Sequence, residues 1–236
     1  MRIALVGCGF LGSLLAEEIT KRLGAFELGV EWLLFDDDEV DSRNPFNHLY
    51  STSHIGMPKV VALAEYLDRY AGGILDEIAA CREERVVAGS AEQLVLLREC
   101  SLIIDAVDNL SARQLLWELA VTHNLTLLHV GVSQAGIGCV EWTAPGYDSF
   151  SMSPIQLARY SEEELAGMTM LEKLKPCDLI AFRGVGLNIA LAGAKAVALW
   201  RGMDAEKTLD LPGMFYTSWQ ADNLSHMLRE VRASNG

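Results

Sequence analysis

The chain has 236 residues, half of them hydrophobic, and a formal net charge of −13. This length and apolar content suffice to form the core of one domain, and they exclude a disordered chain. We therefore expect residues 1–236 to form a single domain. The acidic balance argues against a nucleic-acid partner, because nucleic-acid phosphates require a basic surface. Five cysteines without a C-x-x-C pair exclude a disulfide framework and a four-thiolate zinc site. No secretory signal pattern precedes the first apolar run, so we expect a cytoplasmic protein.

The first segment predicts a strand, a glycine-rich turn and a helix. Residues 1–6 form an apolar, β-branched run that leads into Gly7-x-Gly9-x-x-Gly12. Gly7 permits a tight turn, Gly9 lets the backbone approach a phosphate, and Gly12 lets the helix lie close to the strand. The helix N-terminus then offers N–H groups to an anion. The helix is predicted because apolar residues recur on one of its faces, namely Leu11, Leu14, Leu15 and Ile19. This segment therefore indicates nucleotide binding.

A second strand is expected at residues 30–35, and an acidic run follows it. An acidic residue at the end of the second strand of a Rossmann-like fold holds a ribose hydroxyl, and Asp36 fits that place. A polar segment at residues 41–56 comes next, and loops of such length are usually functional. Lys59 then opens a helix, where a cation is poorly placed with respect to the helix dipole. Two interpretations remain open, an exposed lysine or a lysine that meets an anionic ligand.

The remaining elements continue an alternation of strands and helices, which predicts an α/β, Rossmann-like fold with a largely parallel sheet covered on both faces. Mixed strands are expected in the C-terminal part. Further strands are expected at residues 85–89, 101–105, 125–132, 139–143 and 215–219, and helices at residues 92–100, after Asn109, at 161–167 and at 186–200. The apolar stretch at 184–200 is interrupted by Asn188 and Lys195, so it predicts a buried helix and no membrane span. A polar, mobile excursion is expected at about 146–180. His129, within a strand, is expected to be a satisfied core histidine.

Five blocks of the sequence occur in an order that resembles one family. They are Gly7-x-Gly9-x-x-Gly12; Asp36-x-Asp38-x-Val40 with Asn44; Gly56-x-x-Lys59; Asp105-x-x-Asp108-Asn109 with Arg113; and the segment Gly131 to Pro145. This order is similar to that of the ThiF/MoeB-type, ubiquitin-activating-enzyme-like adenylyltransferases. The resemblance covers nearly the whole chain, but a shared fold does not by itself establish a shared activity.

The resemblance implies that the chain uses ATP and Mg²⁺ to adenylate a carboxylate and release pyrophosphate. The carboxylate would be the C-terminus of a small ubiquitin-like sulfur carrier, a peptide or a small carboxylic acid. The resemblance implies that the three glycines, Asn44 and Lys59 contact the phosphates. It implies that Asp36, in the block that includes Asp38, contacts the ribose and that Asp108 is a ligand of Mg²⁺. Asn109 and Arg113 would lie in the same pocket. It also implies a homodimer.

The sequence departs from the family pattern in three places. The arginine that neutralises the triphosphate is Asn47 here, and Arg43 is the nearby candidate to replace it. Loss of such a charge would cost about 3 kcal/mol of transition-state stabilisation. The two C-x-x-C pairs of many members are absent, so no structural zinc is expected. The chain also begins at the first strand, without the family's usual N-terminal helix.

Cys177 is the single cysteine between residues 146 and 185, in the segment where many relatives carry an acyl-accepting cysteine. Its neighbours Lys173 and Lys175 would lower the pKa of its thiol, whereas Asp178 would oppose them. Two interpretations are kept, an acceptor of the activated acyl group and an incidental thiol.

Three functions remain open at this stage. The first is an active adenylyltransferase, and the second is a non-catalytic subunit or carrier-binding module with the same fold. The third, which is less favoured, is an NAD-dependent oxidoreductase, supported by the glycines and Asp36. Lys59 and the block around Asp108 argue against the third, because a nicotinamide enzyme has no use for them.

Overall fold

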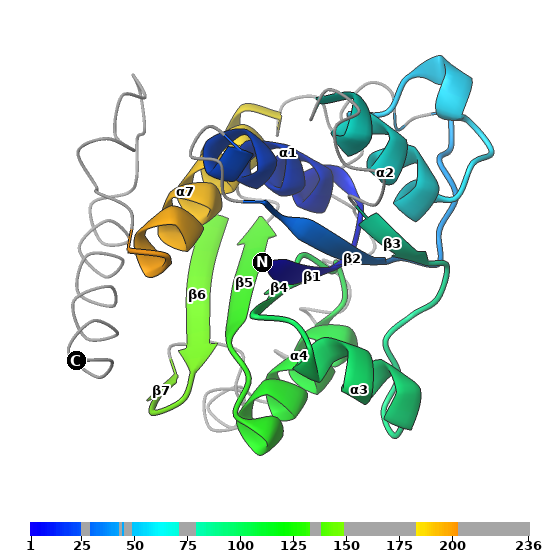
Figure 1. The fold of residues 1–236 in the computed structure, drawn as a ribbon. Helices are drawn as coiled ribbons and strands as arrows, with labels where there is room; N and C mark the ends of the chain where they lie inside the picture. The colour runs from blue at the N-terminus through cyan, green and yellow to red at the C-terminus, as the bar shows by residue number, and fades with distance from the viewer. Residues whose placement is uncertain are drawn as a thin grey trace, which may run out of the picture.

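A computed structural model describes residues 1–24, 29–42, 44, 49–70, 79–132, 138–148 and 183–202. Within these residues seven strands form one sheet in the order β3-β2-β1-β4-β5-β6-β7 (Figure 1). The strands are β1 (Arg2–Val6), β2 (Glu31–Phe35), β3 (Ala79–Arg82), β4 (Leu102–Asp105), β5 (Leu127–Val132), β6 (Gly138–Ala144) and β7 (Tyr147–Asp148). The helices are α1 (Phe10–Gly24), α2 (Lys59–Tyr70), α3 (Ala91–Arg98), α4 (Leu110–His123) and α7 (Arg183–Trp200), with a short 3₁₀ helix η2 (Thr52–His54).

The sheet is parallel from β3 to β5 and antiparallel at β6 and β7. This arrangement confirms the expected Rossmann-like α/β fold with mixed strands toward the C-terminal part. The chain builds outward from β1 through β2 to β3 and then returns to place β4 on the other side of β1. The carboxyl ends of β1 and β4 therefore flank a topological switch point, the place where such sheets bind ligands.

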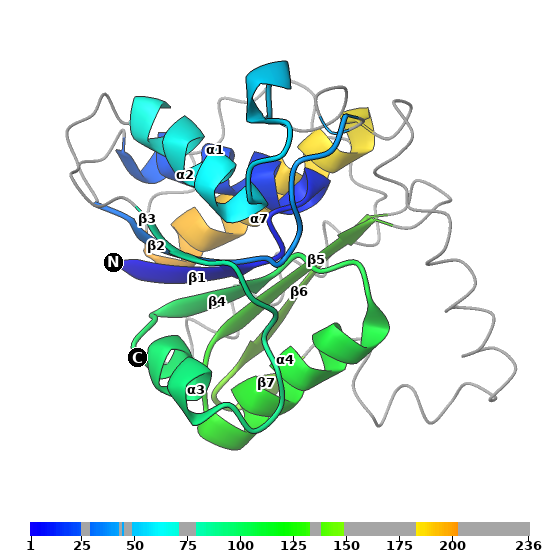
Figure 2. The ribbon, with the colours of Figure 1, turned by 90° about the vertical axis from the view of Figure 1, so that its right-hand side faces the viewer.

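Helices α1, α2 and α7 cover one face of the sheet, and α3 and α4 cover the other (Figures 1 and 2). The side chains of strand β1 are buried alternately on the two faces of the sheet. Ile3 and Leu5 belong to the core beneath α1, α2 and α7, whereas Ala4 and Val6 belong to the core with α3 and α4. Because both faces are buried, the strand is a continuous apolar run rather than an alternating one.

Helix α7 lies against α1 and returns the chain to the first core (Figure 1). At its end the Trp200 ring lies beside that of Trp142 on β6, with 6.2 Å between the ring centroids. None of the helices in the described part of the chain is long and apolar enough to cross a membrane.

The expectation of a strand at residues 85–89 is wrong, because the third strand of the sheet is β3, at Ala79–Arg82. The backbone of the later segment bonds to the side chain of Gln93 instead of to a neighbouring strand. The Val87 N–H donates to Oε1 of Gln93 at 2.8 Å, and Nε2 of Gln93 donates to the Arg85 carbonyl at 2.8 Å. Gln93 is itself buried, so one polar side chain determines the path of this loop.

Strand β7 was not expected from the sequence, and it follows a turn at Gly146 with a positive φ of 79°. The first part of the expected excursion at 146–180 is therefore part of the sheet. The remainder of that excursion, including the expected helix at 161–167, lies outside the described residues, as does the expected strand at 215–219.

Candidate nucleotide-binding site

The glycine turn after β1 is shaped by two close approaches. Gly7 has a positive φ of 95°, and a Cβ placed on it would lie 2.8 Å from the backbone of Ala106 in the loop after β4. A Cβ on Gly12 would overlap the carbonyl oxygen of Gly7, so the first turn of α1 packs directly on the glycine turn. A Cβ on Gly9 would meet nothing within 4 Å. Gly7 and Gly12 are thus required by packing, whereas Gly9 faces open space at the N-terminus of α1.

The carboxylate of Asp36, directly after β2, is joined to the glycine turn. Its Oδ2 accepts the backbone N–H of Cys8 at 2.6 Å, and its Oδ1 accepts that of Asp38 at 2.9 Å. Burial raises the pKa of the Asp36 carboxyl, although Lys59 and these two hydrogen bonds act in the opposite direction. A carboxylate has about four lone-pair sites, so each oxygen can still accept a further hydrogen bond from a donor such as a ribose hydroxyl.

Lys59 is the first residue of α2 and forms an ion pair with Asp38. Its Nζ lies 2.6 Å from Oδ2 of Asp38, and its backbone N–H donates to the Asp38 carbonyl at 2.9 Å. The lysine is 8% exposed, so the interpretation of an exposed lysine is wrong. Because the Asp38 side chain is 49% exposed, the pair is buried on the lysine side and open on the carboxylate side.

Carboxylate oxygens of Asp36, Asp37 and Asp38 lie within 4.8 Å of one another. Each of these residues has a partner within the chain, since Asp37 accepts from Nε of Arg85 at 2.6 Å. The cluster is therefore balanced by cations and backbone N–H groups, and we do not assign a metal ion to it.

The loop after β4 carries Asp108 and Asn109, and Arg113 lies in the first turn of α4, which follows. Asn109 caps α4, because its Oδ1 accepts the Ala112 N–H at 2.8 Å. Asp108 is exposed beside this cap. The close approach of Ala106 to Gly7 places the loop against the glycine turn. An exposed carboxylate at the carboxyl edge of β4 suits Mg²⁺, which is usually held by one or two carboxylates together with phosphate oxygens.

Arg113, for which the resemblance implied a place in the ligand pocket, is partly buried and contacts β5 and the loop after β4. Its Nη1 contacts the ring of His129 and its Nη2 donates to the Val107 carbonyl. His129 is a satisfied core histidine as expected, and its Nδ1 lies 2.7 Å from Oδ2 of the buried Asp105. Burial alone would raise the pKa of Asp105, but His129 and Arg113 outweigh it and lower the pKa below its usual value of 3.8.

Asn44 closes a turn in the polar segment. Its Oδ1 accepts the Asp41 N–H at 2.9 Å, and its own N–H donates to the Asp41 carbonyl at 3.1 Å. This use of the side chain is local, and the amide N–H donors of Asn44 are the groups that could meet a phosphate. Arg43, Asn47 and Cys177 lie outside the described residues.

Tyr50 is a contact of the glycine turn that the sequence did not reveal. Its side chain is buried, and its hydroxyl donates to the Cys8 carbonyl and lies 3.5 Å from the Lys59 carbonyl. One phenol therefore joins the glycine turn to the start of α2. A single tyrosine in a polar segment offers no periodic signal from which this contact could be inferred.

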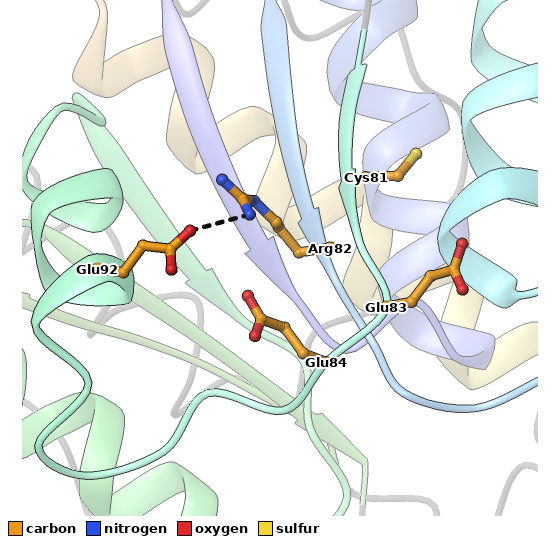
Figure 3. Close-up of a pocket in the computed structure, with 5 residues that line it drawn as sticks. All are labelled: Cys81, Arg82, Glu83, Glu84 and Glu92. Atoms are coloured by element: carbon orange, nitrogen blue, oxygen red, sulfur yellow. Dashed lines mark hydrogen bonds and ion pairs between the residues drawn. The ribbon is translucent and has the colours of Figure 1, made fainter.

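A hollow in the surface lies beside the end of β3, lined by Cys81, Arg82, Glu83, Glu84 and Glu92 (Figure 3). Within it, Nη1 of Arg82 lies 3.2 Å from Oε1 of Glu92. The remaining glutamates leave the lining with an excess of negative charge. Such a lining repels a triphosphate, so the hollow is not an alternative to the glycine turn as a phosphate site.

The fold and these residues define a Rossmann-like protein with a glycine turn at its switch point. The profile of the ThiF family matches residues 1–156, and the chain belongs to that family. No curated protein matches the chain.

Three solved structures match part of the chain. A structure described as TcdA (CsdL) has a TM-score of 0.47 and 22% identity, over 56% of this chain and 50% of its own. The structure of SeMet PaaA has a TM-score of 0.45 and 21% identity, over 56% of this chain and 38% of its own. The tRNA N6-threonylcarbamoyladenosine dehydratase TcdA of E. coli has a TM-score of 0.46 and 20% identity, over 56% of this chain and 52% of its own. The match thus spans about half the length of these proteins or less.

Proposed function

We propose that this chain is an adenylyltransferase that uses ATP and Mg²⁺ to activate a carboxylate. The observation that carries the proposal is the nearly buried Lys59 ammonium, held 2.6 Å from Asp38 next to the place where the glycine turn bonds to Asp36. A ThiF-family chain with a cation, a glycine turn and an acidic strand end at one edge of the sheet has the groups that a nucleoside triphosphate requires.

Each part of the nucleotide has a candidate partner among these residues. Asp36 would accept hydrogen bonds from the ribose hydroxyls, and the backbone at Gly9 with the N-terminus of α1 would meet the phosphates. Lys59 would exchange part of its contact with Asp38 for the triphosphate charge, and Asn44 and Arg43 would contact the same phosphates. Asp108 would hold Mg²⁺, which supplies charge neutralisation between the phosphate oxygens when it is bound.

The proposed reaction is attack by a carboxylate oxygen of the substrate on the α-phosphorus of ATP. A new bond forms between that oxygen and phosphorus, the bond to the β-phosphate oxygen breaks, and the products are an acyl-adenylate and pyrophosphate. The residues of the chain have little covalent chemistry to perform in such a transfer, because positioning and charge neutralisation provide most of the catalysis. Lys59 supplies a fixed positive charge toward the leaving pyrophosphate.

The substrate carboxylate is the C-terminus of a ubiquitin-like carrier, a peptide or a small acid. We propose that the active form is a homodimer in the cytoplasm. Sedimentation of a species of about 26 kDa at micromolar concentration would contradict the dimer, since that is the mass of one chain, 25.9 kDa.

The test is a calorimetric titration with Mg-ATP and with NAD, followed by ATP–pyrophosphate exchange with a panel of these carboxylates. We expect binding of Mg-ATP in preference to NAD, and exchange that depends on one class of carboxylate. Asp108→Asn should abolish exchange, and Glu118→Gln, an exposed change on α4, serves as its control.

Two outcomes would replace the proposal. Binding of NAD without binding of ATP would favour an oxidoreductase. Binding of ATP without exchange for any carboxylate would favour a non-catalytic subunit or carrier-binding module, as the loss of the family arginine at Asn47 suggests.

A further inference from the structure

Three neighbouring strands place polar side chains in a row on the face that α4 covers. Asp105 on β4 pairs with His129 on β5, and His129 pairs with Glu141 on β6. Because directly paired residues point to the same face of a sheet, the three side chains adjoin one another. Asp105 is fully buried and His129 is 3% exposed. A row of this kind inside an apolar core is costly unless its members satisfy one another.

The side chain of Arg113, on α4, contacts His129, the middle residue of this row. Its Nη1 lies 2.9 Å from Nδ1 and 2.5 Å from Nε2 of His129, and it donates to the Val130 carbonyl at 3.3 Å. Nδ1 of the same ring lies 2.7 Å from a carboxylate oxygen of Asp105. The imidazole of His129 therefore lies between the Asp105 carboxylate and the Arg113 guanidinium and contacts both.

Both partners of His129 also hold the peptide groups of Val107. Oδ1 of Asp105 accepts the Val107 N–H at 3.1 Å, and Nη2 of Arg113 donates to the Val107 carbonyl. The residue that follows is Asp108. The backbone that leads to Asp108 is therefore fixed from two sides by groups whose mutual arrangement depends on one imidazole.

We propose that His129 is a positioning residue that sets the loop carrying Asp108 without touching the nucleotide or the metal ion. The position of His129 within a strand predicts a buried core histidine, and the residue is buried. Its distinctive feature is that Asp105 and Arg113, which its ring contacts, both hold Val107, the residue before Asp108. The catalytic consequence rests on the proposed function, whereas the effect on the loop does not.

The first test measures amide hydrogen exchange in the wild type and in the variant His129→Leu, without nucleotide. Loss of the two bonds should raise exchange at residues 107–109 by about tenfold or more, because the Val107 N–H is bonded to the Asp105 carboxylate that the imidazole contacts. Amides at the start of α1, which β1 positions, should change less. His129→Asn keeps a donor close to Asp105 and should restore part of the protection. His123→Leu, at the other end of α4, is the control.

An equal rise in exchange throughout the sheet in both His129 variants would assign the residue to general core stability and overturn the proposal. Unchanged exchange at residues 107–109 would overturn it as well. If His129→Leu does not fold, the comparison between His129→Asn and the wild type decides the same question.

The second test measures the affinity for ATP with Mg²⁺ and with a chelator. His129→Leu should lose most of the gain that Mg²⁺ provides while it keeps the affinity for metal-free ATP. Because both changes act through one loop, the double variant with Asp108→Asn should be no weaker than Asp108→Asn alone. Additive losses would overturn the catalytic part. A wild type that binds Mg-ATP but adenylates nothing would overturn the proposed function and leave the positioning role intact.

Discussion

The Nζ of Lys59 lies 2.6 Å from Oδ2 of Asp38, and the two residues are 21 positions apart in the chain. The ion pair joins the end of the β2 segment to the first residue of α2. An ammonium at a helix N-terminus is unfavourable with respect to the helix dipole, and the carboxylate compensates for it. A triphosphate would supply the same compensation with more charge.

Lys59→Ala should therefore weaken the binding of ATP by about tenfold or more, equivalent to about 1.4 kcal/mol, and the binding of adenosine much less. The unfolding free energy should change little, because Asp38 is half exposed and water can solvate it. Arg69→Ala, which removes an exposed cation from the same helix, is the matched control. Titration calorimetry with both ligands provides the measurement, and equal losses for ATP and adenosine would show that Lys59 does not meet the phosphates.

Tyr50→Phe should lower the unfolding free energy by about 1–3 kcal/mol, since it leaves the buried Cys8 carbonyl without its donor. The affinity for ATP should fall as well, because the glycine turn loses its link to α2. Tyr66→Phe removes a hydroxyl that donates to Glu17 at 2.7 Å and leaves the glycine turn untouched. Urea unfolding and ATP titration of both variants separate the effects, and equal ATP affinities in the two would refute the link.

The parts of the site that could be predicted are those for which a local pattern specifies the position. The glycine spacing between a strand and a helix identifies the turn, and the end of an apolar strand identifies Asp36. The contacts of Tyr50 and His129 could not be predicted, because their partners are 42 and 24 residues away and no period connects them. The expected strand at 85–89 failed for a related reason, since one buried side chain, Gln93, bonds to that backbone.

Asp105→Asn should reduce stability most at neutral pH and progressively less in acid. The pKa of Asp105 in the folded chain lies below its usual value of 3.8, so the stabilisation is complete above that pH. Below it the unfolded chain binds the proton first, and the unfolding free energy of the wild type falls until the folded pKa is passed. The difference between wild type and variant in urea unfolding should therefore narrow as the pH falls below about 3.8. A constant difference would mean that the Asp105 carboxylate is not specifically stabilised in the folded state.

Cys177→Ala should leave ATP–pyrophosphate exchange intact and abolish any thioester product, if the Cys177 thiolate attacks the acyl-adenylate and AMP leaves. Cys100→Ala is the control, because burial raises the pKa of that thiol to about 11 and keeps it protonated at neutral pH. Mass spectrometry of the protein after incubation with ATP and substrate detects the adduct. Full transfer by the Cys177 variant would mean that Cys177 has no covalent role and that the acyl group passes from the adenylate to its acceptor without it.

The glycine turn allows a comparison of two substitutions that differ in position but not in chemistry. Gly12→Ala places a methyl group on the carbonyl oxygen of Gly7, so α1 or the turn must shift. We expect a loss of about 1–3 kcal/mol in unfolding free energy, or more, as is usual for overpacking.

Gly9→Ala adds the same methyl group where nothing lies within 4 Å. Its unfolding free energy should stay within about 0.5 kcal/mol of the wild type, as for other substitutions that disturb no contact. If a phosphate approaches the backbone at Gly9, the methyl group obstructs it, and the affinity for ATP should fall by about tenfold while the affinity for adenosine changes little. Urea unfolding and calorimetry on the two variants test both statements. A Gly9→Ala protein that is as stable as the wild type and binds ATP equally well would mean that the phosphates do not lie against this turn.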